Sequence, residues 1–160
     1  MIRGLMITVA MALCAGAAQA DYRLHGLHIN DFHSRLEPIT ATGGNCDAVA
    51  DAVGECFGGI ARLATQVNGL RNTLQAEGEN VILLDAGDQY QGSLFYTIYR
   101  GIETVEFMNA IGFDAMTVGN HEFDDGPAGL QALADGADFP VISGNLDLSQ
   151  SDALRDRVGR

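Results

Sequence analysis

The sequence predicts an α/β domain built on a largely parallel sheet, and three observations support this prediction. Short apolar runs typical of β-strands alternate with segments whose apolar residues recur every three or four positions. The resulting order of strand, helix, strand, helix, strand is typical of right-handed βαβ crossovers. A polar stretch containing Asp, His or Asn follows each of the first three strand-like runs. In parallel sheets, functional side chains gather beyond the carboxyl ends of the strands, where these stretches would lie.

Four strands and three helices are expected. The strands are the apolar runs at residues 22–29, 81–84, 115–118 and 140–143. The first helix follows from apolar residues at steps of three and four, namely Ile60, Leu63, Ala64, Val67, Leu70 and Leu74. The second helix shows the same spacing in Ile102, Val105, Met108 and Ile111, with Gly112 as its expected C-cap. The third spans residues 127–134 and has Pro127 in its first turn, where proline is tolerated.

Length, composition and charge limit what the chain can be. A chain of 160 residues with 47% apolar residues can bury the core of one domain and no more. The formal net charge of −12 at pH 7 would repel the phosphate backbone of DNA or RNA, which argues against nucleic-acid binding. A small phosphate ester stays compatible with this charge, because a bound metal ion can attract it. The oligomeric state is not indicated.

Residues 1–20 have the features of a cleaved signal peptide. Arg3 supplies the positive charge, residues 7–17 form the apolar segment, and Ala18-Gln19-Ala20 is a small-residue cleavage site. A membrane anchor is the alternative, but roughly ten apolar residues fall short of the ~20 that a spanning helix needs. Cys14 lacks the preceding small residue of a lipid-attachment site. We therefore expect a periplasmic or secreted protein with no stable membrane anchor, whose mature chain covers residues 21–160.

Two cysteines remain after the predicted cleavage, Cys46 and Cys56. In an oxidising compartment they are expected to form a disulfide that closes a loop of about ten residues. Two free thiols are the alternative. A structural zinc site is disfavoured, because the spacing is wide and no histidine lies beside either cysteine.

The first two polar stretches offer candidate metal ligands. Asp31 and His33 are two residues apart, so their side chains would leave on the same face if strand geometry continued through them. A turn-capping Asp and a surface His would explain this pair equally simply. In the second stretch, Asp88 follows Gly87 and is the better candidate, whereas Asp85 is expected to satisfy backbone groups or support other ligands.

The third polar stretch combines an amide, an imidazole and a carboxylate in Asn120, His121 and Asp124. A carboxylate partner fixes the tautomer of a histidine and favours its cationic form. An N-capping Asn and a solvated His are the alternative. Ligands from three strand ends beside such a histidine nevertheless favour a metal site.

Six motifs occur along the chain in the following order: Asn30-Asp31-Phe32-His33, Gly58-Gly59-Ile60-Ala61-Arg62, Leu84-Asp85-Ala86-Gly87-Asp88, Gln91-Gly92-Ser93, Val118-Gly119-Asn120-His121-Glu122-Phe123-Asp124 and Ser143-Gly144-Asn145. Together they resemble the amino-terminal part of a bacterial secreted 5′-nucleotidase of the calcineurin-like metallophosphoesterase superfamily. The resemblance covers residues 27–146, nearly the whole predicted mature segment.

The resemblance implies a four-layer α/β sandwich, of which this chain is the incomplete amino-terminal portion, and a site for two divalent metal ions. Asp31 and His33 would bind the first ion, Asp88 would bridge both ions, and Asn120 would bind the second. His121 would face the scissile phosphate with Asp124 as its partner. Two such ions activate a water for attack on phosphorus and neutralise the phosphoryl oxygens. The mixed ligands suit Zn, Mn, Fe or Co without selecting one.

The chain departs from the family in one respect: it has no histidine after His121, whereas relatives supply further histidine ligands from later strands. His25 and His28 lie inside the first predicted strand and are expected to be packed or hydrogen-bonded there. We therefore expect a fragment or truncated product that is weakly active or inactive alone.

Three functions are compatible with these residues. The first is hydrolysis of a nucleotide or another small phosphate ester, most simply as a 5′-nucleotidase. The second keeps the fold and the metals but cleaves a cyclic nucleotide or, as in a sulfur-oxidation relative, a thiosulfonate. The third is a non-catalytic remnant.

Overall fold

The computed structural model describes residues 22–159 and confirms the predicted parallel sheet. Five strands lie in the order β1-β4-β5-β6-β7, and each neighbouring pair is parallel. Their bounds are β1 Leu24–Ile29, β4 Asn80–Asp85, β5 Ala115–Thr117, β6 Val141–Ile142 and β7 Val158–Gly159. All the carboxyl ends therefore meet at one edge of the sheet. The predicted signal peptide lies outside the described residues, so its prediction stays open.

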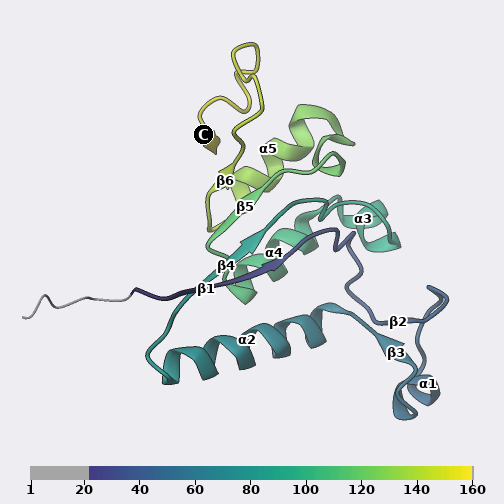
Figure 1. Cartoon of the computed structure of the whole chain (residues 1–160). Coiled ribbons are helices and arrows are strands. Elements are labelled where there is room, and N and C mark those ends of the chain that lie inside the picture. The colour runs from purple at the N-terminus through teal and green to yellow at the C-terminus, as the bar shows by residue number, and fades with distance from the viewer. Residues whose placement is uncertain (1–21, 160) are drawn as a thin grey trace, which may run out of the picture.

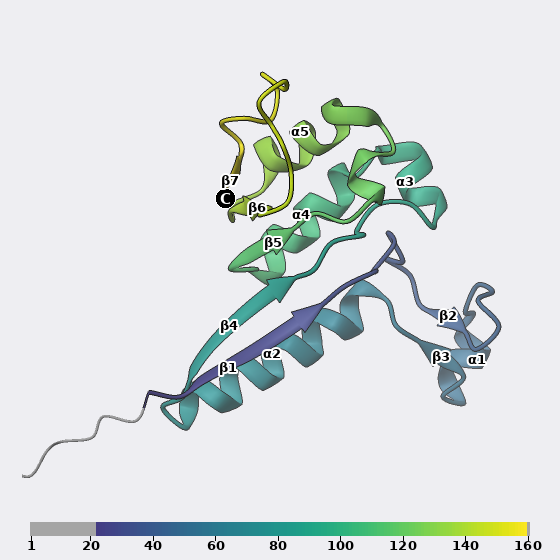
Figure 2. The ribbon, with the colours of Figure 1, turned by 45° about the horizontal axis from the view of Figure 1, so that its top comes forward.

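Three helices connect the strands, as predicted, and they lie on the same side of the sheet (Figures 1 and 2). They are α2 Ile60–Ala76, α4 Ile102–Ile111 and α5 Gly126–Gly136. Gly112 caps α4 in the left-handed conformation, with φ of 77°, and its N–H donates to the Met108 carbonyl at 3.0 Å. Within residues 22–159, every helix is too short or too polar to cross a membrane.

The two faces of the sheet differ in exposure. Leu83 and Met116 are buried beneath the helices, whereas Leu84 and Ile142 point the other way and are about two-fifths exposed, at 37% and 42%. This difference follows from the alternation of side chains along a strand. The described residues thus supply one sheet layer and one helix layer of the four-layer sandwich that the family resemblance implies.

The hydrophobic core lies between this sheet and its helices. The strands supply Leu83, Met116, Val141 and Val158, and α4 and α5 supply Val105, Met108, Ile111, Leu130 and Leu133. Most of the other buried members lie in α3 and in the loops. The most deeply buried members are Leu83, Tyr90, Tyr96, Met116, Leu130, Leu133 and Leu154. This packing fixes the strand ends relative to the helices, and therefore also positions the loops that follow the strands.

Several short elements were not predicted. They are β2 Ile39–Thr40, α1 Ala48–Ala52, β3 Cys56–Phe57, α3 Leu94–Tyr99, the 3-10 turn η1 His121–Phe123 and the two-residue strand β7. Elements of two to six residues carry too few positions for a periodic pattern to emerge from the sequence.

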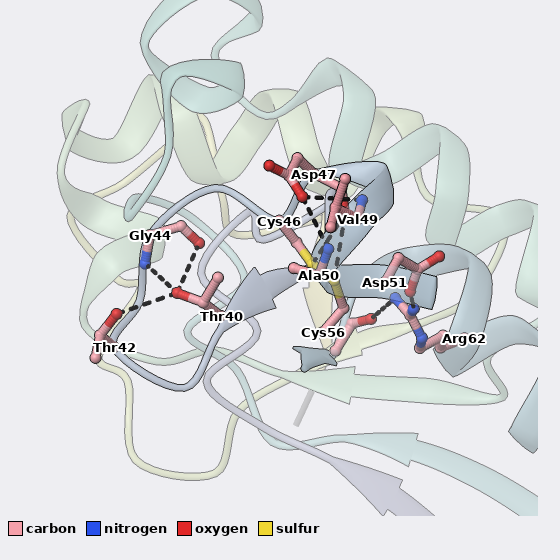
Figure 3. Close-up of a disulfide and its surroundings, with 11 residues drawn as sticks. Thr40, Thr42, Gly44, Cys46, Asp47, Val49, Ala50, Asp51, Cys56 and Arg62 are labelled. Carbon is pink, nitrogen blue, oxygen red and sulfur yellow. Dashed lines mark hydrogen bonds and ion pairs between the residues drawn. A yellow bond between two sulfur atoms is a disulfide. The ribbon is translucent and has the colours of Figure 1, made fainter. Parts of the chain in front are cut away.

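The predicted disulfide between Cys46 and Cys56 is confirmed, with Cα atoms 5.7 Å apart (Figure 3). It closes the small unit formed by β2, α1 and β3, which projects from the side of the sheet (Figure 1). Asp47 caps α1, because its carboxylate accepts the N–H groups of Val49 and Ala50 at 3.0 and 2.8 Å. Arg62 of α2 pairs with Asp51 and ties this unit to the main helix layer.

Candidate metal centre

Three loops meet at the carboxyl edge of the sheet, and backbone hydrogen bonds join the first two. The loop after β1 runs beside the loop after β4, beyond the point where regular strand pairing stops. Three amides of the first loop donate to three carbonyl oxygens of the second over 2.9 to 3.2 Å: Asp31 to Gly87, His33 to Asp88 and Ser34 to Gln89. These hydrogen bonds hold the two loops together and so fix the positions of their side chains relative to one another.

Three of the predicted ligand residues have left-handed backbones. Asp31, His33 and Asp88 have φ of 53°, 53° and 57°, a conformation that is rare for residues other than glycine and is concentrated at functional sites. The condition under which Asp31 and His33 would share a face, that strand geometry continues through them, is therefore not met, since β1 ends at Ile29. The turn still brings the two side chains together, with His33 Nε2 3.6 Å from Asp31 Oδ1.

Two glycines allow the second and third loops to touch. A Cβ atom on Gly87 would lie 2.3 Å from the backbone nitrogen of Gly119, and a Cβ atom on Gly119 would lie 2.1 Å from Asp88 Oδ1. Gly87 also has φ of 93°, which side chains disfavour. Glycine at both positions is what lets the Asp88 carboxylate sit against the third loop.

The loops bring His33, Asp88 and His121 together. One ligand atom from each of these residues lies within 4.8 Å of the other two. His33 Nδ1 is 3.1 Å from the Tyr90 carbonyl oxygen, a bond that requires the proton on Nδ1 and leaves Nε2 free to bind a cation. Two imidazoles and a carboxylate are suitable donors for a divalent transition-metal ion. The residues present therefore fit a metal ion.

His121 and Asp124 form the predicted pair. His121 Nδ1 lies 2.7 Å from Asp124 Oδ2. This hydrogen bond raises the pKa of the His121 imidazole and lowers the pKa of the Asp124 carboxyl. The Gln91 side chain also bonds Asp124 and lowers its pKa further. The imidazole is thus held in one orientation, with its charged form favoured.

The remaining predicted ligands, Asp31 and Asn120, lie on the first and the third loop. Asp31 reaches the three clustered residues through its 3.6 Å approach to His33, and its side chain is 55% exposed. Asn120 is exposed and immediately precedes His121 at the start of η1, where its carbonyl accepts the Phe123 N–H at 3.2 Å. Asn120 therefore lies on the third loop, as the sequence predicts.

Asp85 lies below the loops and is 3% exposed. Its carboxylate accepts the Gly87 N–H at 2.7 Å, which agrees with the expectation that Asp85 satisfies backbone groups. Burial raises the pKa of Asp85 to about 7, although the bond from Gly87 opposes this rise, and the negative charge of Glu122 adds to it.

Sequence reasoning missed the role of one residue, Glu122, although it stands inside the Gly119-Asn120-His121-Glu122 motif. Its carboxylate is fully buried and accepts hydrogen bonds from both the second and the third loop. An acid directly after the candidate ligands was the only available signal.

The two histidines of β1 lie outside the site. His25 is at the opposite end of the sheet, where its Nε2 is 3.4 Å from Glu79 Oε2. His28 is exposed within β1.

The fold and this centre define an α/β protein with a group of residues able to hold a metal ion at the ends of its parallel strands. The chain belongs to the calcineurin-like phosphoesterase family, whose model matches residues 25–154. Members of this family use divalent metal ions, which agrees with the donor atoms that the three loops bring together.

Individual relatives are similar over most of the chain. The 5′-nucleotidase of Bos taurus is 45% identical over 139 residues, 86% of this chain, and the snake venom 5′-nucleotidase of Gloydius brevicauda is 43% identical over 145 residues, 89% of this chain. The crystal structure of a 5′-nucleotidase precursor from Thermus thermophilus superposes with a TM-score of 0.70 and 36% identity over 85% of this chain. The chain spans about a quarter of the length of these relatives, 23%, 23% and 25% respectively.

Proposed function

We propose that this chain is part of an exported, metal-dependent 5′-nucleotidase that hydrolyses the phosphate monoester of a nucleotide. The observation that carries this proposal is the approach of His33, Asp88 and His121 within 4.8 Å at the strand ends of a calcineurin-like phosphoesterase fold. The names of the relatives support the substrate class, since the two similar sequences and the similar crystal structure are all described as 5′-nucleotidases.

The proposed site would hold two divalent ions, drawn from Zn, Mn, Fe or Co. Asp31 and His33 would hold the first ion, Asp88 would be shared by both, and Asn120 would hold the second. The free Nε2 of His33 and the 3.6 Å approach of Asp31 support the first assignment. The backbone N–H of His121 donates to Asp88 Oδ1 at 3.0 Å, which aims this carboxylate between the second and third loops. Such ions, when bound, supply a nucleophilic water near neutral pH and offset the charge of the phosphoryl oxygens.

His121 is proposed to act on the phosphate and its leaving group. Its Nδ1 is engaged by Asp124, so Nε2 is the nitrogen that faces outward. In the charged form Nε2 carries a proton that it can donate to the departing nucleoside oxygen. Asp124 stabilises that charged form, and the Gln91 side chain holds Asp124 in place.

Export is proposed from three features. Residues 1–20 have the pattern of a signal peptide. Cys46 and Cys56 form a disulfide, a bond that persists in oxidising compartments. One relative is a protein of snake venom, which is a secreted fluid. A periplasmic or extracellular location agrees with all three.

The proposal is tested by phosphate release from AMP, using the protein expressed from its complete reading frame. We expect hydrolysis that stops when a chelator removes the metal ions and returns when Mn²⁺ or Zn²⁺ is added. Parallel assays with a cyclic nucleotide and a thiosulfonate separate the alternative reactions, since the latter would release sulfate.

Matched variants show whether the described residues carry the reaction. Asn120→Ala and His121→Ala should each abolish most AMP hydrolysis. The control is His28→Ala, because His28 lies on β1 outside the site. Full AMP hydrolysis by both site variants would contradict the proposal.

A further inference from the structure

The carboxylate of Glu122 is 0% exposed, and its two oxygens accept four backbone N–H groups. Oε1 accepts from Gln89 at 2.8 Å and Tyr90 at 3.3 Å. Oε2 accepts from Asp88 at 3.0 Å and Gly119 at 2.6 Å. With both oxygens engaged in this way, Glu122 is not available as a ligand for a cation.

These four amides belong to two different loops. Three are consecutive residues beginning at Asp88, in the loop after β4, and the fourth is Gly119, directly before Asn120. The third loop also donates back, because the His121 N–H bonds Asp88 Oδ1 at 3.0 Å. Glu122 and Asp88 therefore close a ring of hydrogen bonds between the loops that bear the proposed ligands.

The negative charge of Glu122 explains why its buried carboxylate accepts several backbone N–H groups. A buried carboxylate is costly unless hydrogen bonds replace its water, and bonds from N–H groups to an ionised acceptor are stronger than neutral ones. Another buried acid of the described chain, Glu103 on α4, is 7% exposed and has no hydrogen-bond partner on either oxygen. Burial alone therefore does not produce the contacts that Glu122 makes.

We infer that Glu122 is a positioning residue that holds Asp88 and Asn120 at the separation that metal binding requires. The inference rests on the proposed function only in assigning these two residues to the metal ions. Glu122→Gln keeps the size of the side chain but replaces one acceptor oxygen by an NH₂ group, which would face backbone N–H donors. The two loops should then separate.

The test measures metal affinity and does not depend on turnover. Metal-free protein, expressed from its complete reading frame, is titrated with Co²⁺ and followed by its visible absorption spectrum. We expect Glu122→Gln to weaken binding about 10- to 100-fold, as is typical when a residue supporting metal ligands is lost. Glu122→Asp retains the charge and should recover part of the affinity. Glu103→Gln, the matched buried control, should bind Co²⁺ as the wild type does.

A second measurement covers the case in which Glu122→Gln fails to fold. The amide hydrogens of Gln89 and Tyr90 donate to Glu122, so they should exchange slowly with solvent in the metal-free wild type. Exchange of both amides at the rate of open loops would overturn the inference, as would unchanged Co²⁺ affinity in a folded Glu122→Gln variant. Failure of AMP hydrolysis with normal Co²⁺ binding would contradict the proposed function alone.

Discussion

His121 and Asp124 are joined by a 2.7 Å contact between Nδ1 and Oδ2 across one turn of the chain. This contact places a negative charge behind the imidazole and leaves its other nitrogen directed away from Asp124. The pair lies beside His33, whose ring centroid is 5.0 Å from that of His121. An imidazole supported in this way is suited to proton donation at the rim of a metal site.

We predict that Asp124→Asn lowers kcat for AMP and shifts the pH profile. The bond to Asp124 raises the pKa of His121, so the charged imidazole persists to higher pH in the wild type. Without it, the alkaline fall in kcat should begin at lower pH. A general acid typically contributes about 10²- to 10⁴-fold to the rate, so the loss of kcat should not exceed this range. Asp135→Asn, at an exposed acid of α5, is the control, and an unshifted alkaline limb in Asp124→Asn would argue against the role of the pair.

We predict that His33→Ala removes most of the affinity for the first metal ion. His33 presents Nε2 to the site because Nδ1 is bonded to the Tyr90 carbonyl oxygen. Loss of a residue that supports a metal ligand typically weakens metal binding about 10- to 100-fold. Loss of a direct ligand should weaken it by at least as much. Isothermal titration with Zn²⁺ measures this change. His28→Ala removes a histidine of the same region outside the site, and equal losses in both variants would exclude a specific role for His33.

We predict that Gly87→Ala destabilises the protein, whereas Gly69→Ala stabilises it. The added methyl group at Gly87 would lie 2.3 Å from the nitrogen of Gly119, at a backbone with φ of 93°. A loss of about 1–3 kcal/mol or more in the free energy of unfolding is expected. Gly69 lies within α2 with nothing within 4 Å of the new carbon, so alanine should add about 0.5–1 kcal/mol. Urea unfolding monitored by circular dichroism measures both, and equal effects would contradict the close approach of the loops.

We predict that Asp85→Asn stabilises the metal-free protein more at pH 8 than at pH 5. The pKa of Asp85 is about 7 in the folded state, against an ordinary value of 3.8. The folded state therefore binds this proton more tightly than the unfolded state, and wild-type stability decreases as pH rises from about 4 to about 7. Asparagine carries no such proton, so the variant should escape this decrease. Unfolding free energies in the presence of a chelator test this, and a pH-independent difference between the two proteins would refute it.

The main elements of the fold could be predicted from local patterns. Helix α4 begins and ends where the spacing of its apolar residues indicates, and Gly112 caps it as expected. Strands β1, β4, β5 and β6 are found at the predicted runs, with ends that differ by one or two residues. Such patterns are readable because burial of one face imposes a fixed period on a helix or strand.

The backbone of the site could not be predicted in the same way. Asp31 and His33 would share a face if strand geometry continued through them, but both have left-handed φ values. This conformation is disfavoured locally, and it is held by bonds to the carbonyl oxygens of Gly87 and Asp88, more than fifty residues away in sequence. No sequence pattern within the first loop predicts those hydrogen bonds.

The sequence by itself determined the alternation of strands and helices, the pair of cysteines and the residues able to bind a metal ion, because each depends on residue type and short spacing. The tertiary structure alone decided how the three loops contact one another. It determined at which positions the close approach of the loops requires glycine. It also determined that the Glu122 carboxylate accepts four backbone N–H groups from two loops. The physical reason is that hydrogen bonding and close packing act between atoms that are adjacent in space, and only the folded chain brings these residues together.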